Sequence, residues 1–233
     1  MSDASVSAGS TAMTIDVISD VVCPWCFIGR RRLGEALAQF AEREPAVRPL
    51  VSWHPFQLNP DLPPQGVDRK AYLQAKFGGA ERAQQVYERV TAAGRSVGIP
   101  FDFDAIERQP NTLDAHRLVA WAQSRNEGDA DALVEGLFRA NFLEGRYVGS
   151  TDELVALAEG AGFDAADARA LLESGALKDV VAESDRRARE MGIGGVPFFI
   201  FDGKTALSGA QEPSAIVAAI RQARAAAMET SDE

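Results

Sequence analysis

The spacing of hydrophobic and polar positions changes twice along this chain of 233 residues. Residues 14–20 are rich in β-branched side chains and alternate weakly, which predicts a strand. Apolar residues then recur at helical spacing over 27–44, and Pro24 fits the first turn of that helix. A second strand is expected over 46–56. The proline-rich stretch 59–66 predicts a break in the structure.

The middle of the chain has an almost wholly helical pattern. We expect a loop over 99–110, followed by a helix that is capped at Asn111 or Thr112. Ser150, with Glu153 three residues later, predicts a capping box. Helices are expected over 67–78, 81–98, 112–126, 129–145, 151–160, 164–174 and 176–191.

The period of two returns near the end of the chain. Strands are expected over 197–201 and 205–209, joined by the turn 202–204 as a hairpin, with a last amphipathic helix from about Pro213. The order is therefore β-α-β, a run of helices, and β-β-α. This order predicts an α/β fold in which both strand groups share one sheet and the middle helices form an insertion.

Composition narrows the classes of partner. The net charge is −10, and only Arg30–Arg32 form a dense basic run, so nucleic acids and anionic membranes are not expected partners. No apolar run approaches the roughly 20 residues that span a bilayer. Residues 1–12 have no basic residue and no apolar segment, so we expect a disordered tail rather than a secretion signal, and a cytoplasmic protein.

The sequence CPWC holds both cysteines of the chain, Cys23 and Cys26, and it admits four interpretations. A structural zinc site needs four ligands, and the two histidines, His54 and His116, are distant in sequence, so no metal site is expected. A structural disulfide would close a ring too small to restrain the unfolded chain much. The other two interpretations are a pair of inert core cysteines and a redox-active dithiol. The position directly after a strand argues against the inert pair.

The dithiol interpretation makes the two cysteines unequal. Cys23 would lie at the start of a helix, where the dipole and free N–H groups favour a thiolate. Cys26, one turn later, would be more buried and act as the resolving thiol. Trp25 either contacts a substrate or packs on a neighbouring loop. Asp20 either takes part in proton transfer or caps the strand end.

Several stretches of the chain resemble the thioredoxin superfamily, in particular its DsbA-like branch with an inserted helical domain. The resemblance is closest to the cytoplasmic FrnE-like proteins. It covers nearly the whole chain beyond the first dozen residues. The stretches that carry it are SDVVCPWCFIG (19–29), HPFQLNP (54–60), NTLDAHRL (111–118), LFRANFLEG (137–145) and GVPFFIF (195–201).

The resemblance implies a thioredoxin-like fold and thiol–disulfide oxidoreductase or isomerase activity, with no required cofactor. It implies that Pro197 is cis and faces the cysteine pair, with the Val196 backbone free to pair with a substrate. Gln57 replaces a glutamate that many members carry, so an acidic proton relay is not implied there. Trp25 replaces the histidine of periplasmic DsbA proteins, which implies a weaker oxidant. Secondary site candidates are Asp20, Gln57, Asn111 and His116.

The resemblance also sets domain limits and alternatives. The thioredoxin-like domain is expected over 13–64 and 176–228, and the helical insertion over 65–175. Expected partners are disulfide-containing proteins or low-molecular-weight thiols, with glutathione as a candidate co-substrate, and the chain is expected to be a monomer or homodimer. One alternative is a glutathione-dependent enzyme similar to 2-hydroxychromene-2-carboxylate isomerases or kappa-class glutathione transferases. Another is a non-enzymatic peptide-binding or metal-sequestering module.

Overall fold

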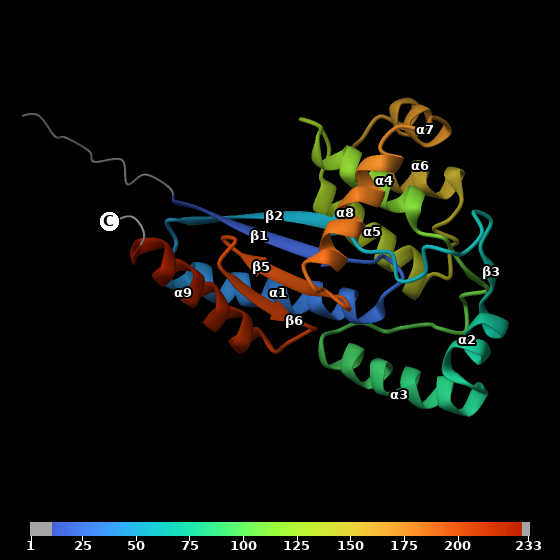
Figure 1. Cartoon of the computed structure of the whole chain (residues 1–233), viewed down its shortest axis with the longest axis horizontal. Helices are drawn as coiled ribbons and strands as arrows, with labels where there is room; N and C mark the ends of the chain where they lie inside the picture. The colour runs from blue at the N-terminus through green and yellow to red at the C-terminus, as the bar shows by residue number, and fades with distance from the viewer. Residues whose placement is uncertain (1–10, 230–233) are drawn as a thin grey trace, which may run out of the picture.

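A four-stranded sheet built from both ends of the chain forms the centre of the protein (Figure 1). The structure, a computed structural model, describes residues 11–229. In spatial order the strands are β2 (Val47–Pro55), β1 (Thr11–Ser19), β5 (Phe198–Phe201) and β6 (Thr205–Ser208). β1 is parallel to β2 and antiparallel to β5. The predicted α/β thioredoxin-like fold, with the terminal hairpin in the same sheet, is confirmed.

The alternation in β1 places its side chains on two faces. Ile15 and Val17 are buried against the apolar face of helix α1 (Pro24–Arg43). Ile18 points the other way and packs with residues near helix α8 (Lys178–Glu190). The last helix, α9 (Pro213–Glu229), packs along α1. The sheet thus fixes the start of α1 directly beyond the end of β1.

The insertion has two parts, which Figure 1 separates clearly. Helices α4 (Leu113–Gln123), α5 (Ala130–Leu143), α6 (Thr151–Gly160) and α7 (Ala165–Glu173) gather beyond one end of the sheet. Helices α2 (Arg69–Phe77) and α3 (Ala80–Ser96) form a hairpin of their own. Phe27 of α1 stacks on Phe138 of α5 with ring centroids 5.1 Å apart, which ties the insertion to the sheet domain. Within residues 11–229 no helix is both long and apolar enough to cross a membrane. The remaining elements are two short strands, β3 (Val67–Asp68) and β4 (Arg108–Gln109).

Several elements begin at other residues than predicted, and two of these differences affect the description of the fold. β1 begins at Thr11, so residues 11 and 12 belong to the sheet, where they pair with Val47 and Arg48, rather than to a tail. The rest of the predicted tail lies outside the described residues. Helix α8 begins only at Lys178, because Leu177 has a positive φ of 63° and cannot continue a helix.

Two local predictions in the insertion are wrong. The predicted loop 99–110 contains β4, which pairs with β3 at the start of a predicted helix. Ser150 precedes α6, but its side chain makes no capping hydrogen bond. Glu153 forms an ion pair with Arg146 instead, so the capping box does not form.

Candidate active site

Cys23 occupies the junction between the end of β1 and the start of α1. It is the residue before the first helical turn, and its backbone is extended, with φ −95° and ψ 110°. Pro24 takes the first helical position, where a missing N–H leaves no hydrogen bond unmade. The Cys23 N–H donates to the Asp20 carbonyl at 3.0 Å, which closes the turn. The Cys23 sulfur therefore lies at the positive end of a 20-residue helix, as expected from the sequence.

Cys26 lies one turn further into α1 and is more enclosed than Cys23. The exposed fraction is 1% for Cys26 and 5% for Cys23, so both thiols are largely covered. Burial raises the pKa of the Cys26 thiol well above its ordinary value, and the hydrogen bond and charge of Cys23 raise it further. The Ser19 hydroxyl opposes this rise. In the reduced protein the raised pKa therefore favours the protonated form of the Cys26 thiol.

The Val196–Pro197 segment faces the cysteine pair from the sheet. The bond between these residues is cis, as the resemblance implied. The Cys23 thiol donates a hydrogen bond to the Val196 carbonyl at 3.5 Å. A Cβ on Gly29 would lie 2.8 Å from Pro197 Cγ, so the approach of α1 to this loop requires glycine. The prediction that left the Val196 backbone free is therefore modified, because its carbonyl already accepts from the reduced thiol.

A cavity of about 250 Å³ opens beside Cys23. Pro24 and Trp25 of the CPWC sequence line one side, and α2 and α3 of the insertion line the other. Trp25 is 38% exposed, so its indole is accessible to a molecule that enters. Cys23 lines this cavity and Cys26 does not, so a substrate that enters it would meet the Cys23 sulfur first.

The secondary candidates lie behind the cysteines and do not line this cavity. Asp20 is fully buried; it accepts from the Leu58 N–H at 2.8 Å, and its Oδ1 lies 3.3 Å from His116 Nε2. The Gln57 side-chain amide donates to the Asn111 Oδ1 at 3.3 Å. These contacts join the end of β2 to the start of α4. They hold the loop that follows β2 against the cysteine turn.

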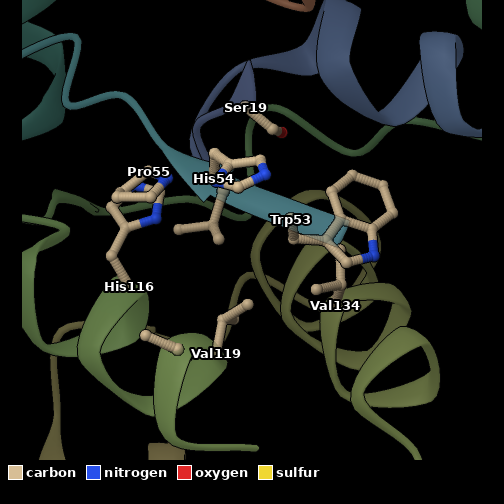
Figure 2. Close-up of a pocket in the computed structure, with 9 residues that line it drawn as sticks. Ser19, Trp53, His54, Pro55, His116, Val119 and Val134 are labelled. Carbon is tan, nitrogen blue, oxygen red and sulfur yellow. The ribbon is translucent and has the colours of Figure 1, made fainter. Parts of the chain in front are cut away.

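A second, much smaller cavity adjoins His116 (Figure 2). Its volume is about 20 Å³, which is enough for one water molecule. Ser19, Trp53 and His54 also line it, from the ends of β1 and β2. Within residues 11–229, no three His, Cys, Asp or Glu side chains are grouped as a metal ion would require.

The insertion contributes residues that the sequence analysis did not single out. Tyr72 and Lys76 of α2, Tyr87 of α3 and Gln109 of β4 all line the cavity beside Cys23. Tyr72 and Lys76 are four residues apart, so helical spacing could have placed them on one face. Nothing in the local pattern indicated that this face would lie over Cys23.

We expect iodoacetamide at pH 7 to modify Cys23 at least roughly tenfold faster than Cys26 in the reduced, folded protein. The reason is that the pKa of Cys26 is raised and only a thiolate reacts, at tenfold per pKa unit. Fragment-ion mass spectrometry of the peptide that carries both thiols measures the two rates. Protein unfolded in urea is the control and should lose the difference. Equal labelling of both thiols in the folded protein would contradict the assignment.

Comparisons with known proteins identify the family of the chain. The chain is 30% identical to the uncharacterized protein YwbO of Bacillus subtilis (strain 168) over 197 residues, or 84% of this chain and 90% of that protein. It is 33% identical to a probable DsbA oxidoreductase from Streptomyces coelicolor, whose crystal structure matches with a TM-score of 0.81 over 91% of this chain and 90% of that chain. The cytosolic disulfide reductase DsbM from Pseudomonas aeruginosa, solved with GSH, shares the fold at 19% identity and a TM-score of 0.59, over 94% of this chain and 100% of that chain. A family model of the DSBA-like thioredoxin domain matches residues 14–221. The chain therefore belongs to the DSBA-like thioredoxin domain family.

Proposed function

We propose that this protein catalyses thiol–disulfide exchange, with Cys23 as the nucleophile and Cys26 as the resolving thiol. The observation that carries the proposal is the position of the Cys23 sulfur. It lies at the start of α1, 3.5 Å from the Val196 carbonyl and beside an open cavity, while Cys26 is enclosed behind it. The family relationship supports oxidoreductase or isomerase chemistry of this kind.

The reaction takes place in two steps. The Cys23 thiolate attacks one sulfur of the substrate disulfide, whose S–S bond breaks, and the departing sulfur takes up a proton. The Cys26 thiol then loses its proton and attacks the Cys23 sulfur of the mixed disulfide, which releases the second substrate thiol. The substrate gains two electrons and two protons, and the protein is left with a Cys23–Cys26 disulfide. Two molecules of a low-molecular-weight thiol such as glutathione, acting as co-substrate, then reduce the Cys23–Cys26 disulfide to the dithiol and leave as their own disulfide.

The finer assignment is to a cytoplasmic, FrnE-like member of the family that acts on protein or small-molecule disulfides. The likeness to DsbM, a cytosolic reductase that was solved with GSH, agrees with a cytoplasmic setting and with glutathione as a candidate co-substrate. An enzyme that uses bound glutathione as its thiol needs no cysteine pair of its own. The presence of both thiols therefore favours exchange chemistry for this chain.

The decisive experiment traps the mixed disulfide. Cys26→Ser protein, mixed with a small disulfide, is expected to accumulate an adduct on Cys23 that mass spectrometry detects, because no resolving thiol remains. Wild-type protein should pass to the intramolecular disulfide without a lasting adduct. Absence of the adduct would refute the proposal. Turnover of a hydroxychromene carboxylate by a Cys23→Ser/Cys26→Ser protein with added glutathione would instead favour the isomerase alternative.

A further inference from the structure

Arg69 is a buried cation at the wall of the cavity beside Cys23. It opens helix α2, and its residue is only 5% exposed. Its guanidinium lies 5.2 Å from the centre of the Tyr87 ring and 5.9 Å from that of Phe103. Nη1 donates to the Gln109 side chain at 3.2 Å, whereas Nη2 is buried with no hydrogen-bond partner among the described residues. Tyr87 and Gln109 themselves line the cavity, so the guanidinium is placed directly behind its wall.

No carboxylate within residues 11–229 forms an ion pair with Arg69. On its other side Arg69 borders a groove that carries Asp102 and Asp104, and neither reaches the guanidinium as a salt-bridge partner. Burial lowers the pKa of Arg69, and only the phenols of Tyr87 and Tyr72 oppose this shift. Its partners, the Gln109 side chain and the Tyr87 and Phe103 rings, carry no negative charge, so burial of the Arg69 charge costs stability that a bound anion would offset.

Lys76 is a second cation at the same cavity, one turn of α2 beyond Tyr72. Its ammonium group donates to the Tyr72 hydroxyl at 2.8 Å and to the Asn59 side-chain oxygen at 3.4 Å. Both partners are uncharged, and no ion pair of Lys76 with a carboxylate is found in the described part of the chain. Lys76 is exposed and lines the cavity, so an incoming ligand can reach it directly.

The charges around this cavity differ from those of the protein as a whole. The chain has 34 Asp and Glu and a net charge of −10, yet none of the residues that line the cavity is acidic. The Tyr87 hydroxyl stays protonated, because burial raises its pKa and the charge of Cys23 adds to the rise. Tyr87 and Cys23 line the same cavity. The lining thus presents hydrogen-bond donors and positive charge beside Cys23.

We infer that the cavity beside Cys23 contains a binding site for a carboxylate of the substrate, made by Lys76 directly and by the buried charge of Arg69 behind Tyr87. The inference rests on the proposed exchange chemistry and names its substrate class as small disulfides that carry carboxylate groups. A cavity of about 250 Å³ suits a small molecule of this kind. Lys76 is the direct partner of the carboxylate, and Arg69 is a positioning residue that acts through its charge.

The test compares three small disulfides that differ in charge. These are 3,3′-dithiodipropionate, which carries two carboxylates, neutral bis(2-hydroxyethyl) disulfide, and cystamine, which carries two ammonium groups. Each oxidises reduced wild-type protein in a single turnover, and each rate is divided by the rate of the same disulfide with free dithiothreitol. We expect the normalised rate for dithiodipropionate to exceed that for cystamine by roughly tenfold or more at low ionic strength. The preference should shrink as salt is added.

Matched variants separate charge recognition from a structural effect. Lys76→Gln and Arg69→Met should each remove most of the preference by slowing dithiodipropionate alone, and Arg69→Lys should restore part of it. Lys70→Gln, which removes an exposed charge next to Arg69 but outside the cavity, should leave the preference intact. A variant that slows all three disulfides equally would indicate a merely structural role.

The outcomes also separate the two proposals. Equal normalised rates for the three disulfides in wild-type protein would overturn the carboxylate site and leave the exchange function standing. An effect of Lys70→Gln as large as that of Lys76→Gln would overturn the site as well. No oxidation by any of the three disulfides would overturn the exchange function, and the carboxylate site with it.

Discussion

Replacing Cys23 with serine is expected to lower thiol–disulfide exchange by roughly a thousandfold or more, to the uncatalysed background. The serine hydroxyl keeps a group of similar size at the start of α1 and can still donate to the Val196 carbonyl, which now accepts from the thiol at 3.5 Å. The loss would therefore come from the chemistry of the sulfur, because a hydroxyl is not ionised at this pH and does not attack a disulfide. Reduction of a small disulfide by the protein with added glutathione measures the rate.

Two controls accompany this variant: its thermal unfolding midpoint and the reactivity of the remaining thiol, Cys26. The thermal unfolding midpoint should stay close to that of the wild-type protein, because the substitution leaves the packing around α1 in place. Cys26 remains, but it is 1% exposed and its pKa is raised, so it should not take over as the nucleophile. Exchange activity that persists in folded Cys23→Ser protein would rule out the assigned roles.

Arg117→Met is expected to lower the free energy of unfolding by about 3–5 kcal/mol, because it removes a buried charge from a set of buried partners. The Arg117 side chain is fully buried on α4. Methionine fills much of the space but donates no hydrogen bond, so the backbone carbonyls that it faces lose their partner. Guanidinium chloride unfolding gives the change from the midpoint and slope. The acceptors are the carbonyls of Leu171, Leu172, Ser174 and Ala176 and the Asp114 carboxylate.

Arg125→Met is the matched control for this prediction. Arg125 follows the same helix and also reaches α7, where it pairs with Asp167, but its side chain is 36% exposed. Water replaces such contacts readily, so we expect little change in the unfolding midpoint. Equal shifts of the unfolding midpoint by the two substitutions would show that burial does not explain the contribution of Arg117 to the free energy of unfolding.

The sequence predicted the secondary structure best where one period lasts for many residues. The apolar spacing over 27–44 and the strands on either side of it recur in the structure as α1, β1 and β2. β3 and β4 are two residues each, too short to show any period, and they exist because their backbones pair with each other. The capping box predicted at Ser150 fails for a similar reason, because the Glu153 side chain forms an ion pair with Arg146, a residue outside its own helix.

In the candidate site, too, only the features that depend on local sequence could be predicted. Cys23 and Cys26 were assigned unequal positions from the sequence alone, because a helix that starts at a known residue fixes which thiol lies at its end. Asp20 and His116 are 96 residues apart, and no local pattern could indicate that they meet at 3.3 Å. Their roles as a support behind the cysteines follow only from the packing of α4 against β2.

The sequence by itself determined the order of the four strands of the central sheet and of the helices between them, the position of the cysteine pair at the start of the first helix, and, through resemblance, the cis bond before Pro197. These features depend on residues that are close together in the sequence, or on a short contiguous sequence motif. Only the tertiary structure decided what surrounds Cys23. Lys76 and Tyr87 line its cavity, with Arg69 behind Tyr87, because the α2–α3 hairpin folds over the start of α1. The cost of burying the Arg69 charge without a counter-charge can be judged only once its neighbours are known.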